Sequence, residues 1–243
     1  MIYFYVAIFV AVGLGGLFVF ACSVPGWPVP GPVVVRGHRQ DGRIALTFDD
    51  GPSPPYTHAI LDLLRERQVR ATFFLCGKNV DRYPEVARRI RQEGHAVGNH
   101  TYSHPFLYFR SRHFMAEEID RAQQSIERAI GERPRFFRPP YGVRWPGLHQ
   151  VLRERGMRLV NWSDTGYDWK FGAERIIRAA LEHLGPGSII LLHDGLETHP
   201  PRPVDQTRTV QALPALIDRA RQAGLSFATL DELLSDAATP AKR

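Results

Sequence analysis

Short apolar runs alternate with amphipathic helical patterns along most of the chain, and this alternation is the strongest constraint on its fold. Because strands that alternate with helices form parallel sheets, the chain is predicted to be an α/β protein. A closed (β/α) barrel is favoured over an open doubly wound sheet, since no GxGxxG pattern follows the first strand. The apolar runs predict strands at 44–48, 71–75, 95–98, 135–137, 158–162, 188–192 and 226–229. Apolar residues at helical spacing predict helices at 57–67, 84–92, 115–130, 146–155, 173–184 and 207–223.

The N-terminal segment is apolar and uncharged. The first 35 residues contain no Lys, Arg, Asp or Glu, and residues 1–22 are almost wholly apolar. About 20 helical residues span the hydrocarbon core of a bilayer, so residues 1–22 are predicted to form one transmembrane helix that precedes the barrel. Two alternatives are open. One is a cleaved signal peptide, although no basic residue opens the segment, and the other is a lipoprotein modified at Cys22.

The rest of the chain is predicted to form one domain with short flanking segments. Residues 23–35 are rich in Pro and Gly and predict an extended spacer. Residues 36–235 form one predicted globular domain, and residues 236–243 form a C-terminal tail. The formal charge of +6 is scattered and accompanies no nucleic-acid-binding motif, so we expect no nucleic-acid partner. Two cysteines, Cys22 and Cys76, cannot make a disulfide framework. We expect a monomer.

Two histidines and two aspartates form the most informative pattern in this domain. His100 and His104 lie four residues apart in GNHTYSHP, and imidazoles at this spacing share one face of a helical turn. Asp49 and Asp50 end the first predicted strand in TFDDGP. One of these carboxylates would complete a metal site that leaves positions open for water and substrate, and the other is then available for proton transfer. Alternatively, Asp49 and Asp50 belong to an ordinary capped turn, and His100 is a buried histidine of the core.

Three more motifs follow later strands. Arg138 in FRPPYG directly follows a strand, so we expect its guanidinium to orient an aspartate and lower its pKa. His193 in LLHDG ends another strand and is a candidate general acid. The segment WSDTGYDWK offers Asp164 and Asp168, and a carboxylate such as Asp168 would orient His193 and raise its pKa. Each motif alone is also compatible with an ordinary surface loop or helix cap.

Five motifs of the chain occur in the order and approximate spacing of the polysaccharide deacetylase family, which is carbohydrate esterase family 4 with its NodB-homology domain. They are TFDDGP, HTYSH, RPPYG, the DW of WSDTGYDW, and LLHD. The chain resembles this family over about residues 40 to 235. The resemblance implies a distorted (β/α)₇ barrel with residues 36–235 as the catalytic domain. It also implies metal-dependent hydrolysis of N-acetyl groups from a polysaccharide that contains N-acetylglucosamine, such as peptidoglycan or a chitin-like glycan, with release of acetate.

The resemblance implies a role for each matching residue. Asp50, His100 and His104 resemble the ligands of one divalent metal ion, usually zinc and sometimes cobalt. Asp49 resembles the general base, and His193 resembles the general acid. The other matches are Arg138, which positions the base, Asp168, which tunes the acid, Tyr141, whose backbone N–H helps to bind the oxyanion, and Trp169 and Leu191, which line the substrate pocket.

Location and substrate are the two further expectations. We expect residues 2–22 to anchor the protein in the cell membrane as a single pass, with the catalytic domain outside the cytoplasm, because the substrates of this family are mainly cell-surface glycans. Arg36 and Arg39 argue for the opposite orientation by the positive-inside rule. The alternative functions are a deformylase or deacetylase of a lipid-linked sugar, and an inactive glycan-binding relative.

Overall fold

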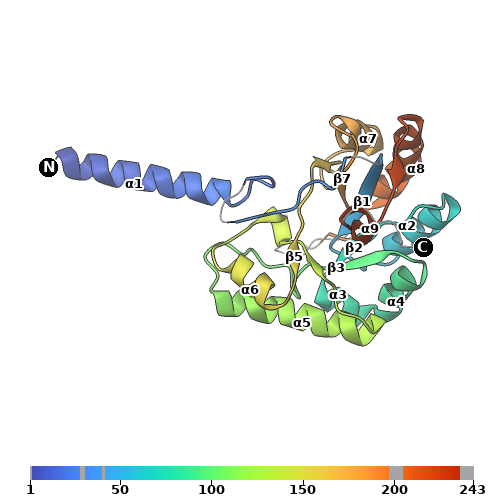
Figure 1. Cartoon of the computed structure of the whole chain (residues 1–243), viewed down its shortest axis with the longest axis horizontal. Helices are drawn as coiled ribbons and strands as arrows, with labels where there is room; N and C mark the ends of the chain where they lie inside the picture. The colour runs from blue at the N-terminus through green and yellow to red at the C-terminus, as the bar shows by residue number, and fades with distance from the viewer. Residues whose placement is uncertain (1, 28–30, 40–41, 197–204, 236–243) are drawn as a thin grey trace, which may run out of the picture.

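A computed structural model describes the chain except for residues 1, 28–30, 40–41, 197–204 and 236–243, and it describes no side chains for residues 2–11. The predicted C-terminal tail therefore lies outside the described residues. The described chain forms a curved sheet with helices around it, and one helix extends away from the rest (Figure 1).

The sheet consists of parallel strands. They are hydrogen-bonded in the order β5-β4-β3-β2-β1-β7-β6, with β8 paired to the start of β1, and every one of these ladders is parallel. The result is a parallel half-barrel with surrounding helices, consistent with the predicted distorted barrel. The described strands are β1 Arg43–Asp49, β2 Thr72–Leu75, β3 Ala96–Asn99, β4 Phe136–Phe137, β5 Arg158–Leu159, β6 Asp164–Thr165, β7 Ile189–His193 and β8 Ser226–Phe227.

The two edges of the half-barrel are joined by an extended segment instead of a ladder. Val34 forms a parallel bridge with Val160 after β5, and Arg36 forms an antiparallel bridge with Ser188 before β7. Between the described parts of β5 and β6 there is no ladder. The end of the predicted spacer therefore lies against the sheet.

Every strand and helix predicted from apolar periodicity is present within a few residues, whereas the helical turn predicted around His100 and His104 is not. The elements that the prediction missed are β6, α3, α9 and η1, which have two to six residues and too little periodicity to be recognised. The described helices are α1 Ile2–Ala21, α2 Tyr56–Glu66, α3 Gly77–Arg82, α4 Pro84–Gln92, α5 Arg112–Ile130, the 3₁₀ helix η1 Pro140–Gly142, α6 Leu148–Glu154, α7 Ala173–Leu181, α8 Thr207–Gln222 and α9 Leu230–Leu233.

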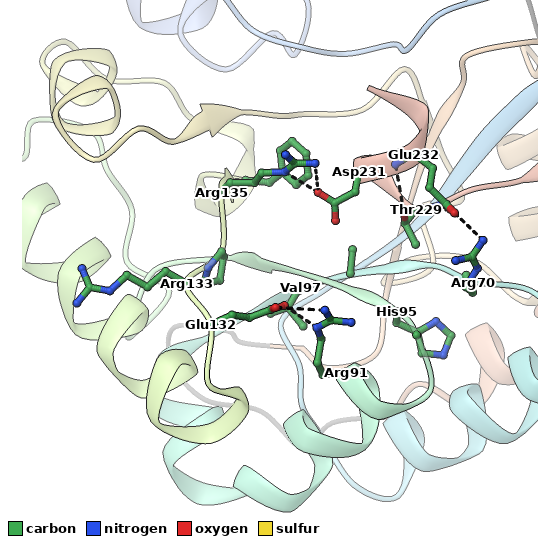
Figure 2. A pocket seen from close by; sticks show the side chains of 14 residues that line it. Arg70, Arg91, His95, Val97, Glu132, Arg133, Arg135, Thr229, Asp231 and Glu232 are labelled. Atoms are coloured by element: carbon green, nitrogen blue, oxygen red, sulfur yellow. Dashed lines mark hydrogen bonds and ion pairs between the residues drawn. The ribbon is translucent and has the colours of Figure 1, made fainter. Parts of the chain in front are cut away.

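A polar cavity of about 370 Å³ lies at the N-terminal ends of β2, β3 and β4 (Figure 2). Six of its charged side chains are partly exposed and form ion pairs with one another. Exposed pairs of this kind contribute about 0–1 kcal/mol each. In parallel barrels this end of the sheet serves stability, and the chemistry is built at the C-terminal ends of the strands. The ion pairs of the cavity join Arg91 to Glu132, Arg70 to Glu232 and Arg135 to Asp231.

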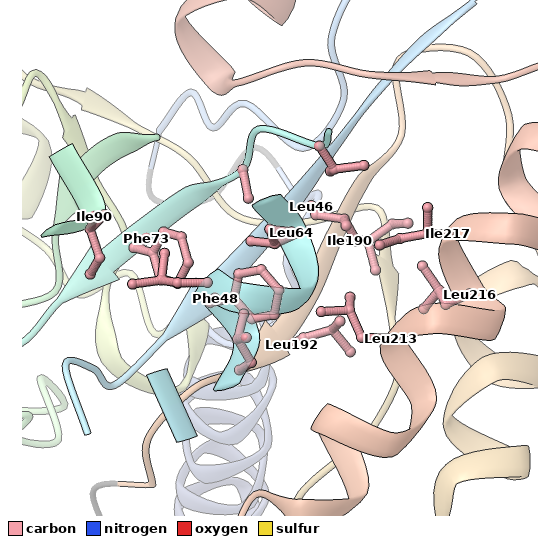
Figure 3. Packing of buried hydrophobic residues seen from close by; sticks show 14 of the residues in the cluster. Leu46, Phe48, Leu64, Phe73, Ile90, Ile190, Leu192, Leu213, Leu216 and Ile217 are labelled. Carbon is pink, nitrogen blue, oxygen red and sulfur yellow. The ribbon is translucent and has the colours of Figure 1, made fainter. Parts of the chain in front are cut away.

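Strand β1 lies at the centre of the sheet and separates the main core from the interior of the half-barrel. Because side chains alternate across a strand, Leu46 and Phe48 face α2 and α8 in the main hydrophobic cluster (Figure 3). Thr47 and Asp49 project from the other face of β1, where the guanidinium of Arg138 reaches both. Because side chains alternate between the two faces of β1, the side chain of Asp49 lies in the interior of the half-barrel.

The predicted membrane anchor requires a correction. Within the described part of the chain, no helix has both the length and the apolar character that a membrane span needs. The predicted single-pass location in the cell membrane, with the domain outside the cytoplasm, is therefore wrong. The described end of α1 packs on the domain instead. Phe18 meets Trp145 with ring centroids 6.1 Å apart, and the Tyr108 hydroxyl donates to the Val19 carbonyl at 3.4 Å. Apolar composition alone does not reveal these contacts of Phe18 and Val19 with the domain.

The chain after α1 wraps around a buried arginine. The fully buried Arg144 donates to the carbonyl of Ala21 at 3.1 Å and to that of Val24 at 2.6 Å. It also donates to the carbonyl of Trp27, and its backbone N–H donates to that of Cys22 at 2.9 Å. A cation at the C-terminal end of a helix satisfies carbonyls that lack partners within the helix and interacts favourably with the helix dipole. Arg144 therefore fixes the end of α1 on the domain.

We expect Arg144→Met to lower the free energy of unfolding by about 3 kcal/mol, because it leaves three carbonyls without their donor. The matched control is Arg153→Met on α6, where the side chain is exposed and the expected change is below about 0.5 kcal/mol. Urea unfolding followed by circular dichroism measures both. Equal stability of the two variants would show that Arg144 does not hold this segment.

Candidate active site

A cavity of about 420 Å³ opens at the C-terminal ends of the strands. Every residue that the sequence predicted for the site lines this cavity except Arg138, Asp168 and the candidate Asp164. Arg138 and Asp168 are each bonded to a lining residue. The lining residues are Asp49, Asp50, His100, His104, Tyr141, Gly142, Trp162, Trp169, Leu191, His193 and Leu196.

Asp50, His100 and His104 form one buried group that can hold a metal ion. Their ligand atoms lie within 4.8 Å of one another, and none of the three residues is more than 4% exposed. The Asp50 Oδ1 atom lies 3.3 Å from Nε2 of His100 and 3.2 Å from Nε2 of His104. Two imidazoles and one carboxylate around a single point are the donor set of a catalytic metal site with open positions.

Hydrogen bonding sets the tautomer of His100. Its Nδ1 lies 2.7 Å from the main-chain carbonyl of Arg138. A carbonyl only accepts, so Nδ1 carries the hydrogen and Nε2 presents its lone pair toward Asp50. Two acceptors that face each other at 3.3 Å repel unless a cation, either a proton or a metal ion, lies between them. The group therefore fits a divalent cation.

The charge on Asp50 agrees with this fit. Burial raises the pKa of Asp50, but nearby positive charges, with His104 and His193 among them, outweigh burial and hold this pKa well below its usual range. Asp50 is therefore an anionic donor at neutral pH, which is the form that binds a cation.

The two histidines lie on a loop and not on the helical turn that their spacing predicted. Residues 100–104 follow β3 without helical structure, and Thr101 and His104 have φ angles of 67° and 55°. Side chains supply the hydrogen bonds that a helix would have made. The Thr101 N–H donates to the side chain of Asn99 at 2.8 Å, and two further N–H groups of the loop donate to the buried Glu118 of α5. These contacts hold both imidazoles toward Asp50.

The buried guanidinium of Arg138 orients the carboxylate of Asp49. Arg138 is fully buried, and its guanidinium donates to Asp49 Oδ1 at 2.7 Å. The same guanidinium donates to the hydroxyl of Thr47 and to two main-chain carbonyls after β5, so its orientation is fixed. The other carboxylate oxygen, Asp49 Oδ2, lies 3.7 Å from Nε2 of His100. Asp49 therefore faces the possible metal group with one oxygen.

His193 lies beside Asp49, because the two residues are register partners in the parallel ladder of β1 and β7. Its Nδ1 lies 2.8 Å from Asp168 Oδ1, and its backbone N–H donates to Asp168 Oδ2 at 2.7 Å. Thr209 of α8 also donates to Asp168 Oδ2, at 2.7 Å. Burial lowers the pKa of His193, but Asp168, Asp50 and Asp49 outweigh burial and raise this pKa to about 9. His193 is therefore protonated at neutral pH, as a general acid must be.

Two aromatic residues form the rim of the pocket. Tyr141 in η1 has a φ of 58°, which is uncommon for a bulky residue, and its ring centroid lies 4.7 Å from that of His104. The ring centroid of Trp169 lies 5.1 Å from that of His193. The rim is therefore in contact with both the possible metal group and the imidazole of β7.

Buried residues that the sequence did not predict also support the site. Asp194 ends the LLHD motif and is fully buried, and it accepts from the hydroxyl of Thr57 at 2.6 Å. Burial raises the pKa of Asp194 to about 7. A Cβ atom at Gly51 would overlap the Asp194 carboxylate, so the turn after Asp50 requires glycine. Asp164, a candidate in the sequence, lies outside the pocket and pairs with Arg36 at 3.5 Å.

Similarity to known proteins agrees with this site. The family model described as polysaccharide deacetylase matches residues 36–160. The chain is 37% identical over 198 residues to a peptidoglycan-N-acetylglucosamine deacetylase of Bacillus cereus, covering 81% of this chain and 70% of that protein. It is 42% identical over 159 residues to a chitooligosaccharide deacetylase of Azorhizobium caulinodans, covering 65% of this chain and 76% of that protein.

A solved structure shares the fold. The crystal structure of a peptidoglycan N-acetylglucosamine deacetylase, in complex with 4-naphthalen-1-yl-N-oxidanyl-benzamide, matches with a TM-score of 0.78 and 34% identity, covering 84% of this chain and 94% of that one. Motifs, fold and family match thus agree with one another. The chain belongs to the polysaccharide deacetylase family of hydrolases, as the sequence motifs predicted.

Proposed function

We propose that the protein removes N-acetyl groups from N-acetylglucosamine residues of a polysaccharide by metal-dependent hydrolysis. The products are acetate and a free amino sugar. The observation that carries this proposal is one pocket that combines the Asp50, His100 and His104 group with Asp49 and His193. The named relatives are deacetylases of peptidoglycan and of chitooligosaccharides, and both kinds of glycan contain N-acetylglucosamine. We also propose that the half-barrel is the distorted (β/α)₇ barrel of this family.

Asp50, His100 and His104 are the proposed metal ligands. Two imidazoles with one carboxylate favour Zn²⁺ or Co²⁺ over the oxygen-preferring Mg²⁺ and Ca²⁺. When bound there, a divalent ion supplies Lewis-acid polarisation of the acetamido carbonyl and lowers the pKa of water.

Asp49 is the proposed general base. Arg138 holds its Oδ1, which leaves Oδ2 to take a proton from the water that attacks the acetamido carbonyl. The backbone N–H of Tyr141 is the proposed donor to the oxyanion that develops on the carbonyl. Leu191 and Trp169 are the proposed apolar walls around the acetyl group and the sugar.

His193 is the proposed general acid. Asp168 occupies its Nδ1, so Nε2 carries the proton that goes to the leaving amine nitrogen as the C–N bond breaks. The inactive alternative finds no support in this pocket, because the acid, the base and the possible ligands are all present.

We expect the purified protein with Zn²⁺ to release acetate from N-acetylglucosamine oligomers, with a loss of one acetyl group in product mass per turnover. A chelator should abolish the release, and added Zn²⁺ should restore it. His100→Ala should lose most of the bound metal in elemental analysis, whereas His113→Ala, at a side chain 83% exposed, is the matched control and should keep it. Full metal occupancy in His100→Ala would contradict the ligand set.

We expect Asp49→Asn to lower kcat by about 10²–10⁴-fold while the metal stays bound, because an amide cannot take the proton of the attacking water. Asp164→Asn is the matched control, since Asp164 is equally buried but lies outside the pocket. Acetate release together with metal content tests both variants. Turnover near the wild-type rate in Asp49→Asn would rule out Asp49 as the base.

We expect Asp168→Asn to move the alkaline limb of the pH profile to lower pH. His193 acts in its protonated form, so activity falls as pH rises through the His193 pKa. The Asp168 carboxylate raises this pKa, and its removal therefore lowers the pH at which activity is lost. The dependence of kcat/KM on pH measures the shift, and an unchanged alkaline limb would contradict the assignment of His193 as the acid.

A further inference from the structure

The hydroxyl of Thr209 contacts the pair formed by Asp168 and His193. Thr209 is fully buried in the first turn of α8, and its Oγ1 donates to Asp168 Oδ2 at 2.7 Å. The same oxygen accepts from the backbone N–H of His193, and Asp168 Oδ1 faces Nδ1 of His193 at 2.8 Å. Thr209 is not among the described residues that line the pocket, so an effect of Thr209 on the reaction passes through Asp168.

The hydrogen of the Thr209 hydroxyl goes to Asp168. A second acceptor, Oε1 of Gln206, lies 3.2 Å from Thr209 Oγ1. The Gln206 amide cannot turn over to offer a donor there, because its Nε2 already donates to the carbonyl of Gly195 at 2.6 Å. The hydroxyl has one hydrogen and two neighbouring acceptors, and the carboxylate is the nearer and stronger one.

Thr209 fixes the Asp168 carboxylate to an element other than the one that Asp168 orients. Among the described residues, Thr209 is the one side-chain or backbone donor to this carboxylate that does not belong to His193. The bonds to His193 alone let the carboxylate and the imidazole shift together. A third bond from α8 removes this freedom, because the carboxylate is then held by two separate elements.

The start of α8 is itself attached to the strands that carry the site. Gln206 is the N-cap residue of α8, is 1% exposed, and holds the carbonyl of Gly195, two residues after His193. The N–H of Gly195 donates to the carbonyl of Asp49 at 3.4 Å. A donor in the first turn of α8 therefore has a defined position relative to the ends of β1 and β7.

We propose that Thr209 is a positioning residue for the reaction: its hydroxyl fixes the Asp168 carboxylate, which holds the His193 imidazole with Nε2 toward the pocket. This inference rests on the proposed deacetylase function and adds α8 to the elements that align the proton donor. Loss of the hydroxyl leaves the imidazole less well aligned with the leaving nitrogen. The effect falls on kcat, since Thr209 does not line the pocket that binds the substrate.

Kinetics of the full-length, Zn²⁺-loaded protein on an N-acetylglucosamine pentamer test the proposal. Thr209→Val keeps the branched side chain without its hydroxyl, and it should lower kcat by about tenfold while KM changes by less than about twofold. Thr209→Ser keeps the hydroxyl and should restore most of kcat. Thr72→Val is the matched control, because Thr72 is also fully buried and its hydroxyl accepts from the Leu230 N–H at 2.9 Å, outside the pocket. It should leave kcat unchanged even if it lowers stability.

Proton NMR of the same protein gives a readout that needs no turnover. A histidine Nδ1–H that donates a hydrogen bond gives a downfield signal, and His193 and His100 each hold such a hydrogen. Disappearance of a signal in His193→Gln assigns it to His193. Thr209→Val should move the His193 signal upfield or broaden it by exchange with water. The His100 signal is the internal control and should stay in place.

The outcomes separate the inference from the function on which it rests. For an active wild type, a kcat in Thr209→Val equal to that in Thr72→Val overturns the positioning role, and so does an equal loss in Thr209→Ser. A wild type that releases no acetate from any oligomer refutes the proposed function. The His193 signal then decides alone, and an unchanged signal in Thr209→Val overturns the inference. If Thr209→Val does not fold, Thr209→Ala replaces it in both measurements.

Discussion

The buried ion pair between Arg138 and Asp49 is the interaction on which the rest of the site depends. Burying a guanidinium costs several kcal/mol unless its donors are satisfied, and here Asp49, Thr47 and two main-chain carbonyls after β5 accept from it. These acceptors lie on the central strand and beyond an edge strand, so Arg138 connects distant parts of the half-barrel. Its own carbonyl takes the hydrogen of His100 Nδ1. One residue thus orients both the proposed base and a proposed metal ligand.

Neighbouring charges shift the pKa values of the acids and imidazoles of the site in opposite directions. The pKa of Asp50 is lowered by the histidines around it, while the pKa of His193 is raised to about 9 by Asp168 and by the aspartates at positions 49 and 50. Register pairing sets His193 beside Asp49, so the proposed acid and the proposed base lie side by side at the ends of two adjacent strands. Pairs of titratable groups whose environments separate their pKa values are typical of acid–base catalysis.

The strands and the chemistry-bearing motifs could be predicted because both are local in sequence. Apolar runs mark the strands, and Asp49, His100, Arg138 and His193 each lie at or just after a strand end, where parallel strands bring side chains together. The helical turn at 100–104 was wrong because its true conformation depends on distant side chains.

Contacts from residues distant in sequence also hold the site residues in place, and no local sequence pattern predicts them. Glu118 on α5 holds the histidine loop, and Thr209 bonds to Asp168 from 41 residues away. The prediction of a membrane anchor was wrong for a related reason, because apolar composition does not reveal that Phe18 and Val19 contact the domain.

The central claim is that Asp50, His100 and His104 hold one metal ion beside Asp49. Anomalous X-ray scattering at the zinc edge, from crystals of the Zn²⁺-loaded protein, tests it most directly. We expect a single strong peak within coordination distance of the Asp50 carboxylate and of Nε2 of both histidines. A peak elsewhere, or none in this pocket while the imidazoles remain hydrogen-bonded to Asp50, would contradict it.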